Sequence, residues 1–138
     1  SHPGGSLGRR LLLRVKDIMH TGDKIPLIGA DATLKQALLE MSKKGLGMTA
    51  IGDADNRLLG IYTDGDLRRT LDSDADIHSA MIRDYMTSGC VTIDAELIAS
   101  AALNLMDENA INALIVTDKN GIIQGALNMH DLLRAGIV

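Results

Sequence analysis

The stretch GIYTDGDLRR, residues 60–69, carries the side chains best suited to hold an anionic ligand. A short apolar run ends at a threonine, and a helix is expected to follow, whose first N–H groups have no partner within the helix and point outward with the positive end of its dipole. Thr63 adds a hydroxyl donor, and Gly65 leaves the backbone approachable. Arg68 and Arg69 supply positive charge. The stretch therefore predicts a seat for a phosphate group.

Two carboxylates, Asp64 and Asp66, lie in the same stretch and need a different role. A carboxylate repels a phosphate that it touches, but Asp66 can accept hydrogen bonds from two neighbouring hydroxyls, as on a ribose. The combination suits a nucleotide or a sugar phosphate. The simpler alternative is that Thr63 and the aspartates only cap the helix, a role worth about 1 kcal/mol for each cap, and that the two arginines are solvated surface residues.

The chain contains an internal repeat. GIYTDGDLRR returns as GALNMHDLLR at 125–134, with Asp131 in register with Asp66, and VKDIMHT at 15–21 returns as IRDYMTS at 82–88. The recurrence of the glycine and the aspartate favours a functional motif over a chance helix cap.

Each copy has the same expected order of elements. In the first copy, apolar residues at helical spacing over 34–41 predict a helix, with Asp31 or Thr33 as its N-cap and Gly45 at its end. The runs MTAI and LLGIY, joined by the turn residues GDADN, predict a hairpin. A short strand before the long helix and a short helix after the hairpin give a β-α-β-β-α unit. The second copy repeats this order, with a long helix expected to carry Leu97, Ala101 and Met106.

Two such units are expected to pack as a pseudo-twofold pair in an α/β fold, because one unit alone leaves much of its sheet face uncovered. We expect residues 1–14 to be the remnant and linker of a preceding domain, 15–74 the first repeat, 75–81 the linker and 82–138 the second repeat. Residues 15–71 hold eight basic and eight acidic residues, whereas 82–138 hold three basic and seven acidic residues. If one copy binds an anion, the charge balance favours the first.

Composition excludes several classes of function. The chain has no Phe or Trp, two Tyr and a formal net charge of −4, which argues against stacking on nucleic-acid bases and against a broad phosphate-backbone footprint. Its one cysteine, Cys90, cannot form an internal disulfide. No apolar run approaches the roughly 18 residues of a membrane span. We expect a cytoplasmic protein that binds neither nucleic acid nor membrane.

Residue spacing gives no support for catalysis by this chain. The four histidines show no metal-ligand spacing and no cysteine joins them, so no metal site and no required cofactor are expected. Cys90 is expected to be a buried, inert thiol rather than a nucleophile. The serines have no nucleophile-elbow context. The sequence therefore favours a binding module over an enzyme.

The motif of a glycine, two apolar residues, a threonine or serine, two variable residues and an aspartate, within a duplicated β-α-β-β-α unit, closely resembles the CBS (cystathionine-β-synthase) domain pair. The resemblance covers residues 15–138. It implies that Thr63 contacts phosphate and that Asp66 holds ribose hydroxyls. It also implies that a base lies near 21–27 and 48–51, which adds Ile25, Met48 and Thr49 as candidate ligand contacts.

The second copy departs from this family pattern. Asp131 matches, but Asn128 stands where the hydroxyl belongs. Asn can still donate a hydrogen bond, so Asn128 and Asp131 remain candidate ligand residues. His130 is expected at the start of the following helix, as a surface residue or, alternatively, as a ligand contact.

A second resemblance comes from both ends of the chain. HPGGSLGRRLLLRVKDIMH and NMHDLLRAGIV are similar to the C-terminal part of bacterial arabinose 5-phosphate isomerases, in which a sugar-isomerase domain precedes a CBS pair. That family interconverts ribulose 5-phosphate and arabinose 5-phosphate for the synthesis of Kdo (keto-deoxy-octulosonate) and lipopolysaccharide. The resemblance implies that His2 matches an active-site histidine of the isomerase domain, without its partners in this chain.

Two functions follow as hypotheses. In the first, the pair is a regulatory module that binds an anionic effector, either an adenine nucleotide or the downstream activated sugar CMP-Kdo, and acts on an N-terminal isomerase domain. In the second, the pair binds nothing and only assembles the enzyme. In both, the family resemblance implies a homodimer of CBS pairs within a homo-oligomer.

Overall fold

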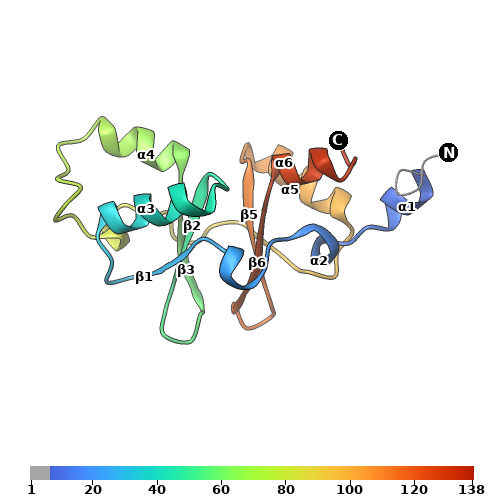
Figure 1. Ribbon diagram of the computed structural model, residues 1–138, viewed down its shortest axis with the longest axis horizontal. Helices are drawn as coiled ribbons and strands as arrows, with labels where there is room; N and C mark the ends of the chain where they lie inside the picture. Colours follow the sequence, from blue (N-terminus) through green and yellow to red (C-terminus); the bar gives the residue numbers. More distant parts are fainter. Residues whose placement is uncertain (1–6) are drawn as a thin grey trace.

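The computed structural model describes residues 7–138, which form two three-stranded sheets standing side by side (Figure 1). The first sheet has the order β1-β2-β3 and the second β4-β5-β6. In each sheet the first strand is parallel to the second and the second is antiparallel to the third. The strands are β1 (Leu27–Gly29), β2 (Met48–Gly52), β3 (Leu58–Thr63), β4 (Thr92–Ile93), β5 (Ala113–Thr117) and β6 (Ile123–Asn128).

Two helices accompany each sheet, one between its first two strands and one after its third. They are α3 (Leu34–Lys44) and α4 (Asp64–Leu71) in the first repeat, and α5 (Ala99–Asn109) and α6 (Met129–Arg134) in the second. The expected α/β fold and the β-α-β-β-α order are thereby confirmed for both repeats. Four short elements precede the repeats' first strands: α1 (Leu7–Leu12), α2 (Val15–Ile18) and 3₁₀ turns at Gly22–Lys24 and Ile82–Asp84.

The long helix of the first repeat has better caps than that of the second. Thr33 accepts a hydrogen bond from the backbone N–H of Gln36 and Gly45 ends α3 at φ +71°, as the sequence predicted. Helix α5 has no side-chain N-cap, and Ala110 adopts φ +52° at its end. The prediction that Leu97 lies on this helix was wrong: α5 begins at Ala99, and Leu97 precedes it with 47% of its surface exposed.

The segments that open the two repeats, residues 15–21 and 82–88, each pack on the other repeat. We call them the exchanged segments. Val15 is fully buried among side chains of the second repeat, and Ile82 is fully buried among those of the first. Short antiparallel bridges continue this exchange: His20 pairs with Ala126 of β6, and Thr87 pairs with Ile61 of β3. Figure 1 shows the N-terminal segment running to the side of α5 and α6. The sequence repeat did not predict this exchange.

The repeated glycines make the exchange possible. A Cβ on Gly125 would lie 2.5 Å from Met19 Sδ, and a Cβ on Gly60 would lie 2.7 Å from Met86 Sδ and 2.8 Å from the Thr87 carbonyl oxygen. Each strand therefore needs a residue without a side chain where the exchanged segment crosses it.

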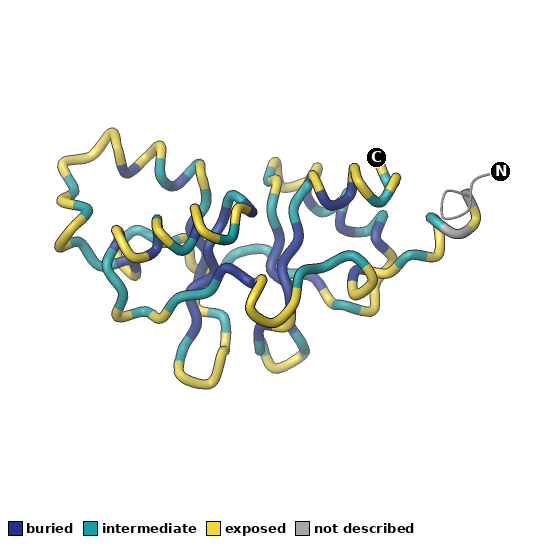
Figure 2. The backbone as a smooth tube through the Cα atoms, in the orientation of Figure 1, coloured by how far each residue is buried: buried dark blue, intermediate teal, exposed yellow. Residues whose placement is uncertain are grey.

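A shared apolar core joins the two repeats. One buried cluster contains Met48 and Ala50 of β2 together with Ile115 of β5 and Ala126 of β6. The hairpin loops also meet, since the Leu58 N–H donates to the Gly121 carbonyl. Figure 2 shows buried residues concentrated along the strands and exposed ones in the two hairpin loops. This agrees with the expectation that each unit covers a face that the other leaves open.

None of the helices described in residues 7–138 has the length and apolar character that crossing a bilayer requires.

Candidate ligand-binding cleft

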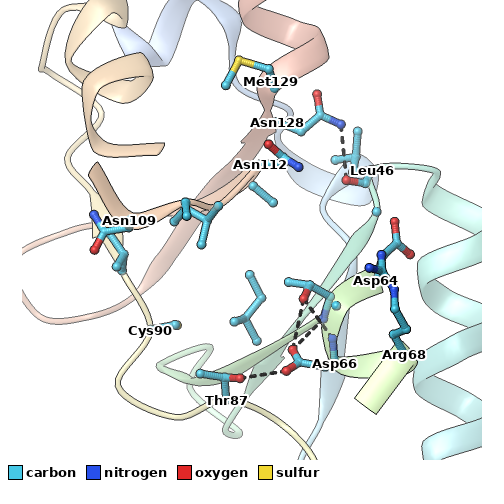
Figure 3. Close-up of a pocket in the computed structure, with 18 of the residues that line it drawn as sticks. Leu46, Asp64, Asp66, Arg68, Thr87, Cys90, Asn109, Asn112, Asn128 and Met129 are labelled. Atoms are coloured by element: carbon cyan, nitrogen blue, oxygen red, sulfur yellow. Dashed lines mark hydrogen bonds between the residues drawn. The ribbon is translucent and has the colours of Figure 1, made fainter. Parts of the chain in front are cut away.

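A cleft of about 990 Å³ lies between the two repeats and receives residues from both (Figure 3). Its first wall is built by the loop after α3 and by the start of α4. Its second wall is built by the loop after α5 and by the start of α6. The segment Gly89–Val91, which leads to β4, also lines it. The two strand-to-helix junctions that carry the repeated motif thus face one cleft.

Thr63 and Asp66 form a reciprocal cap at the start of α4. The Thr63 hydroxyl oxygen accepts a hydrogen bond from the Asp66 N–H at 3.4 Å, and Asp66 Oδ2 accepts one from the Thr63 N–H at 2.9 Å. The Thr63 hydroxyl also donates a hydrogen bond to Asp66 Oδ2 at 3.2 Å. The simpler sequence interpretation, a helix cap, is therefore part of what these residues do.

The second oxygen of Asp66 receives two further donors. The Arg69 guanidinium lies 2.6 Å from Oδ1, and the Thr87 hydroxyl lies 3.0 Å from the same atom. With two donors on each oxygen, the four lone-pair positions of the carboxylate are occupied by the chain's own groups. Asp66 is only 6% exposed, whereas the Arg69 side chain is 72% exposed.

The rest of the first wall carries charge at the rim of the cleft. Asp64, Arg68 and Arg69 are exposed and line it, and Gly65 lies between Asp64 and Asp66. In Figure 3, Asp64 and Arg68 lie together on the α4 side. This wall presents two guanidinium groups and two carboxylates beside the Thr63 hydroxyl.

The second repeat has the same reciprocal cap, but its capping side chain also contacts the first repeat. Asn128 Oδ1 accepts from the Asp131 N–H at 3.0 Å, and Asp131 Oδ2 accepts from the Asn128 N–H at 2.8 Å. The amide Nδ2 of Asn128 donates to the Leu46 carbonyl oxygen of the first repeat at 3.3 Å, as Figure 3 shows. The Asn128 side chain therefore connects the two repeats.

Asp131 itself does not line the cleft. Its Oδ1 lies 2.9 Å from His20 Nε2 and 2.6 Å from the Arg134 guanidinium, and the residue is 6% exposed. Burial raises the pKa of this carboxyl, but the hydrogen bonds from the Asn128 N–H, His20 and Arg134 outweigh burial and lower the pKa below its ordinary value. Asp131 is thus an ionised carboxylate held by the chain's own donors.

The structure brings most of the predicted site residues together. Those that line the cleft are Thr63, Asp64, Gly65, Asp66, Arg68, Arg69, Asn128 and His130. Ile25 and Met48 lie in the apolar core between the repeats, and Thr49 is fully buried with its hydroxyl donating to the Ala37 carbonyl at 3.3 Å. Those three residues do not line this cleft. His2 lies outside the described residues.

Sequence reasoning missed several lining residues. Thr87 reaches Asp66 only because its segment packs on the first repeat, and no pattern in the sequence signalled that contact. Cys90 lines the cleft half-buried, and burial raises the pKa of its thiol. The neutral thiol is the stable form near pH 7. Other missed lining residues lie after α3 (Gly45, Leu46 and Gly47), from the end of α5 into β5 (Asn109, Ala110, Ile111, Asn112 and Ala113), on α6 (Met129 and Leu133), on β3 (Ile61) and before β4 (Gly89 and Val91).

Among the side chains described in residues 7–138, no group of three or more His, Cys, Asp or Glu residues is arranged to hold a metal ion.

Known proteins resemble this chain in sequence and, more distantly, in fold alone. It is 51% identical over all 138 residues to arabinose 5-phosphate isomerase KdsD from Yersinia pestis, from Pseudomonas aeruginosa and from Escherichia coli. The match falls in the C-terminal part of these relatives, and the chain spans 42% of their length.

Solved structures share the fold at lower identity. The CBS domain pair of protein MJ0100, in complex with 5′-methylthioadenosine and S-adenosyl-L-methionine, is 20% identical with a TM-score of 0.79, over 89% of this chain and 94% of that one. CBSX2 in complex with AMP is 20% identical with a TM-score of 0.76, over 91% of this chain and 96% of that one. The family model of the CBS domain matches residues 15–73 and 82–137. With two matched repeats and a shared cleft between them, the chain belongs to the CBS domain family as a tandem pair.

Proposed function

We propose that this CBS pair is the regulatory module of an arabinose 5-phosphate isomerase and that it binds an anionic nucleotide or nucleotide sugar in the cleft. The observation that carries the proposal is the first wall, where Thr63, Asp66 and two arginines converge on one cavity. The high identity to the C-terminal part of KdsD supports the choice of enzyme. Two relatives in fold were solved with adenosine-containing ligands, which supports the choice of ligand class.

The hydrogen bonds of Asp66 suggest how a ligand enters. A ribose diol can replace Arg69 and Thr87 on Oδ1, since both donors are on exposed residues. The displaced Arg69 guanidinium then becomes available to a phosphate, together with Arg68 and the Thr63 hydroxyl. Ligand hydroxyls and ligand phosphate would thus be taken up in one exchange of partners.

CMP-Kdo fits this chemistry as an effector. Its ribose hydroxyls suit Asp66, its phosphate suits Thr63, and its sugar carboxylate suits one of the arginines. As a product made downstream of ribulose 5-phosphate isomerisation, it would report that the pathway is supplied. AMP or ATP is the alternative effector. In either case the ligand regulates only if it binds two states of the full enzyme unequally.

Thermal shift tests the proposal. The chain and its Asp66→Ala variant are heated with AMP, ATP, CMP and CMP-Kdo. A ligand at about 100 times its dissociation constant stabilises the fold by about 2.7 kcal/mol, which raises Tm by several degrees. We expect a shift with at least one nucleotide that disappears in Asp66→Ala. No shift with any of the four would contradict the proposal.

A ligand-free assembly role is the second candidate, and the saturated Asp66 carboxylate favours it. Every lone pair of that group is already used without a ligand. If this second function is right, deletion of residues 15–138 from the full-length isomerase abolishes its homodimer or higher oligomer but leaves its response to effectors the same as that of the intact enzyme. Size-exclusion chromatography with light scattering, combined with effector assays, distinguishes the two functions.

A further inference from the structure

The two walls of the cleft differ in their charged side chains although they are equivalent in the repeat. The first wall contributes Asp64, Asp66, Arg68 and Arg69, whereas the lining residues of the second repeat include no Asp, Glu, Lys or Arg. Met129 stands where the first wall has Asp64, and Leu133 stands where it has Arg68. The second wall therefore combines apolar side chains with three asparagines and one histidine.

The two motif side chains of the second repeat are placed differently from Thr63 and Asp66, because one of them connects the two repeats and the other does not line the cleft. The Asn128 side chain is engaged at both ends, with Oδ1 on the Asp131 N–H and Nδ2 on the Leu46 carbonyl. The Asp131 carboxylate lies behind the wall, between His20 and Arg134. A phosphate or a diol at this wall would have to break the contact between the repeats.

Polar groups on the second wall suit a neutral ring. Asn109, Asn112 and His130 are exposed beside the apolar surface of Ile111 and Met129. Amide and imidazole groups donate and accept hydrogen bonds without requiring a charged partner, and apolar side chains favour the faces of a heterocycle. The continuous volume of about 990 Å³ is at the upper end for ligand pockets, and it leaves room for one ligand that touches both walls.

We propose that the cleft takes one elongated ligand per chain, with its phosphate and sugar hydroxyls against the first wall and a neutral heterocycle against the second. This inference rests on the proposed function and adds the stoichiometry and orientation to it. The second copy of the motif has a structural role instead of binding a second ligand. Asn128 connects the two repeats through Leu46, and Asp131 holds the exchanged N-terminal segment through His20.

Calorimetric titration of the chain with CMP and with AMP tests the stoichiometry. We expect one molecule bound per chain. Asp66→Asn should weaken binding at least tenfold, whereas the matched variant Asp131→Asn should change the dissociation constant less than twofold, because Asp131 does not line the cleft. Two molecules per chain would overturn the inference and leave the proposed function standing. Absence of binding by any nucleotide would overturn both.

A truncated probe tests the orientation. Ribose 5-phosphate keeps the charged end of a nucleotide and lacks its heterocycle. Met129→Ala removes apolar surface from the second wall and should weaken CMP binding about fivefold while leaving ribose 5-phosphate unchanged. Asp66→Asn should weaken both probes. Equal losses for both probes in Met129→Ala would overturn the proposed orientation. Thermal unfolding of each variant without ligand checks that it is folded.

Discussion

The two repeats place the same aspartate in the same local geometry, and yet only one of them faces the cleft. Asp66 and Asp131 each cap a helix, each pair with an arginine at 2.6 Å, and each receive a donor from the exchanged segment of the other repeat. In the first repeat that donor is the Thr87 hydroxyl, and in the second it is the His20 imidazole. The duplicated backbone thus sets the position of each aspartate, whereas a few neighbouring side chains decide whether it lines the cleft.

The charged side chains of the two motifs differ in the same way. The first wall presents arginines and carboxylates to the cleft, while the Asp131 carboxylate of the second motif pairs with His20 and Arg134. The regions around the two motifs also differ in net charge, in the direction expected if the anion lies at the first wall.

Removing the anchors of the exchanged segments should have the largest effect. Ile82→Ala removes a fully buried side chain and should lower the free energy of unfolding by about 2–5 kcal/mol; Val15→Ala deletes fewer methyl groups and should cost less. Because the segments are exchanged, Ile82→Ala should speed hydrogen exchange in α3 and β2, and Val15→Ala should speed it in α5 and β5. Loosening of α5 and β5 by Ile82→Ala would contradict the exchange.

Asp131→Asn should lower the free energy of unfolding by a smaller amount that depends on pH. Because the folded-state pKa of Asp131 is lowered, its ionised form stabilises the fold above the unfolded pKa of about 3.9, and this stabilisation is lost as the pH falls through the lowered folded-state pKa. Near pH 7 the variant should be about 1.5–3 kcal/mol less stable than the parent.

Urea unfolding at a series of pH values measures this difference. The gap between parent and variant should narrow as the pH falls below about 4. Asp74→Asn, at an exposed carboxylate after α4, is the matched control and should give only a small difference. A gap for Asp131→Asn that stays constant down to pH 2 would show that the carboxylate charge contributes nothing.

The surface ion pairs of the exchanged segments should have the smallest effect. Lys16 pairs with Glu96 at 3.1 Å and Arg83 pairs with Asp31 at 3.1 Å, and all four side chains are about half exposed or more. Double-mutant cycles should give coupling energies below about 1 kcal/mol for each pair, decreasing further in high salt. A coupling well above this value would mean that these pairs, and not the buried anchors, hold the segments.

Local patterns in the sequence predicted much of the fold. An N-cap at Asp31 or Thr33, the glycine after α3 and the hairpin turn residues predicted the β-α-β-β-α order, because these features depend on near neighbours, and the structure has Thr33 as the cap. The start of α5 was misplaced because no side-chain cap marks it, so apolar spacing alone included Leu97.

The segment exchange was beyond reach of the repeat analysis. VKDIMHT and IRDYMTS resemble each other, so the repeat shows that Met19 and Met86 are equivalent but not which copy each one packs on. The lining residue Thr87 was missed for the same reason. Conversely, Met48 and Thr49 were chosen from the family resemblance, whereas in this chain all five residues of β2 are buried.

Nuclear magnetic resonance titration of the ¹⁵N-labelled chain with CMP tests the central claim most directly, because it follows both walls at once. If one ligand spans the cleft, the amide signals of Gly65 and Thr87 on one side and of Asn112 and His130 on the other will move together and give one dissociation constant, and Asp66→Asn will weaken both sets equally. Two sets of signals with different dissociation constants, of which only the first responds to Asp66→Asn, would show two independent sites and contradict the account.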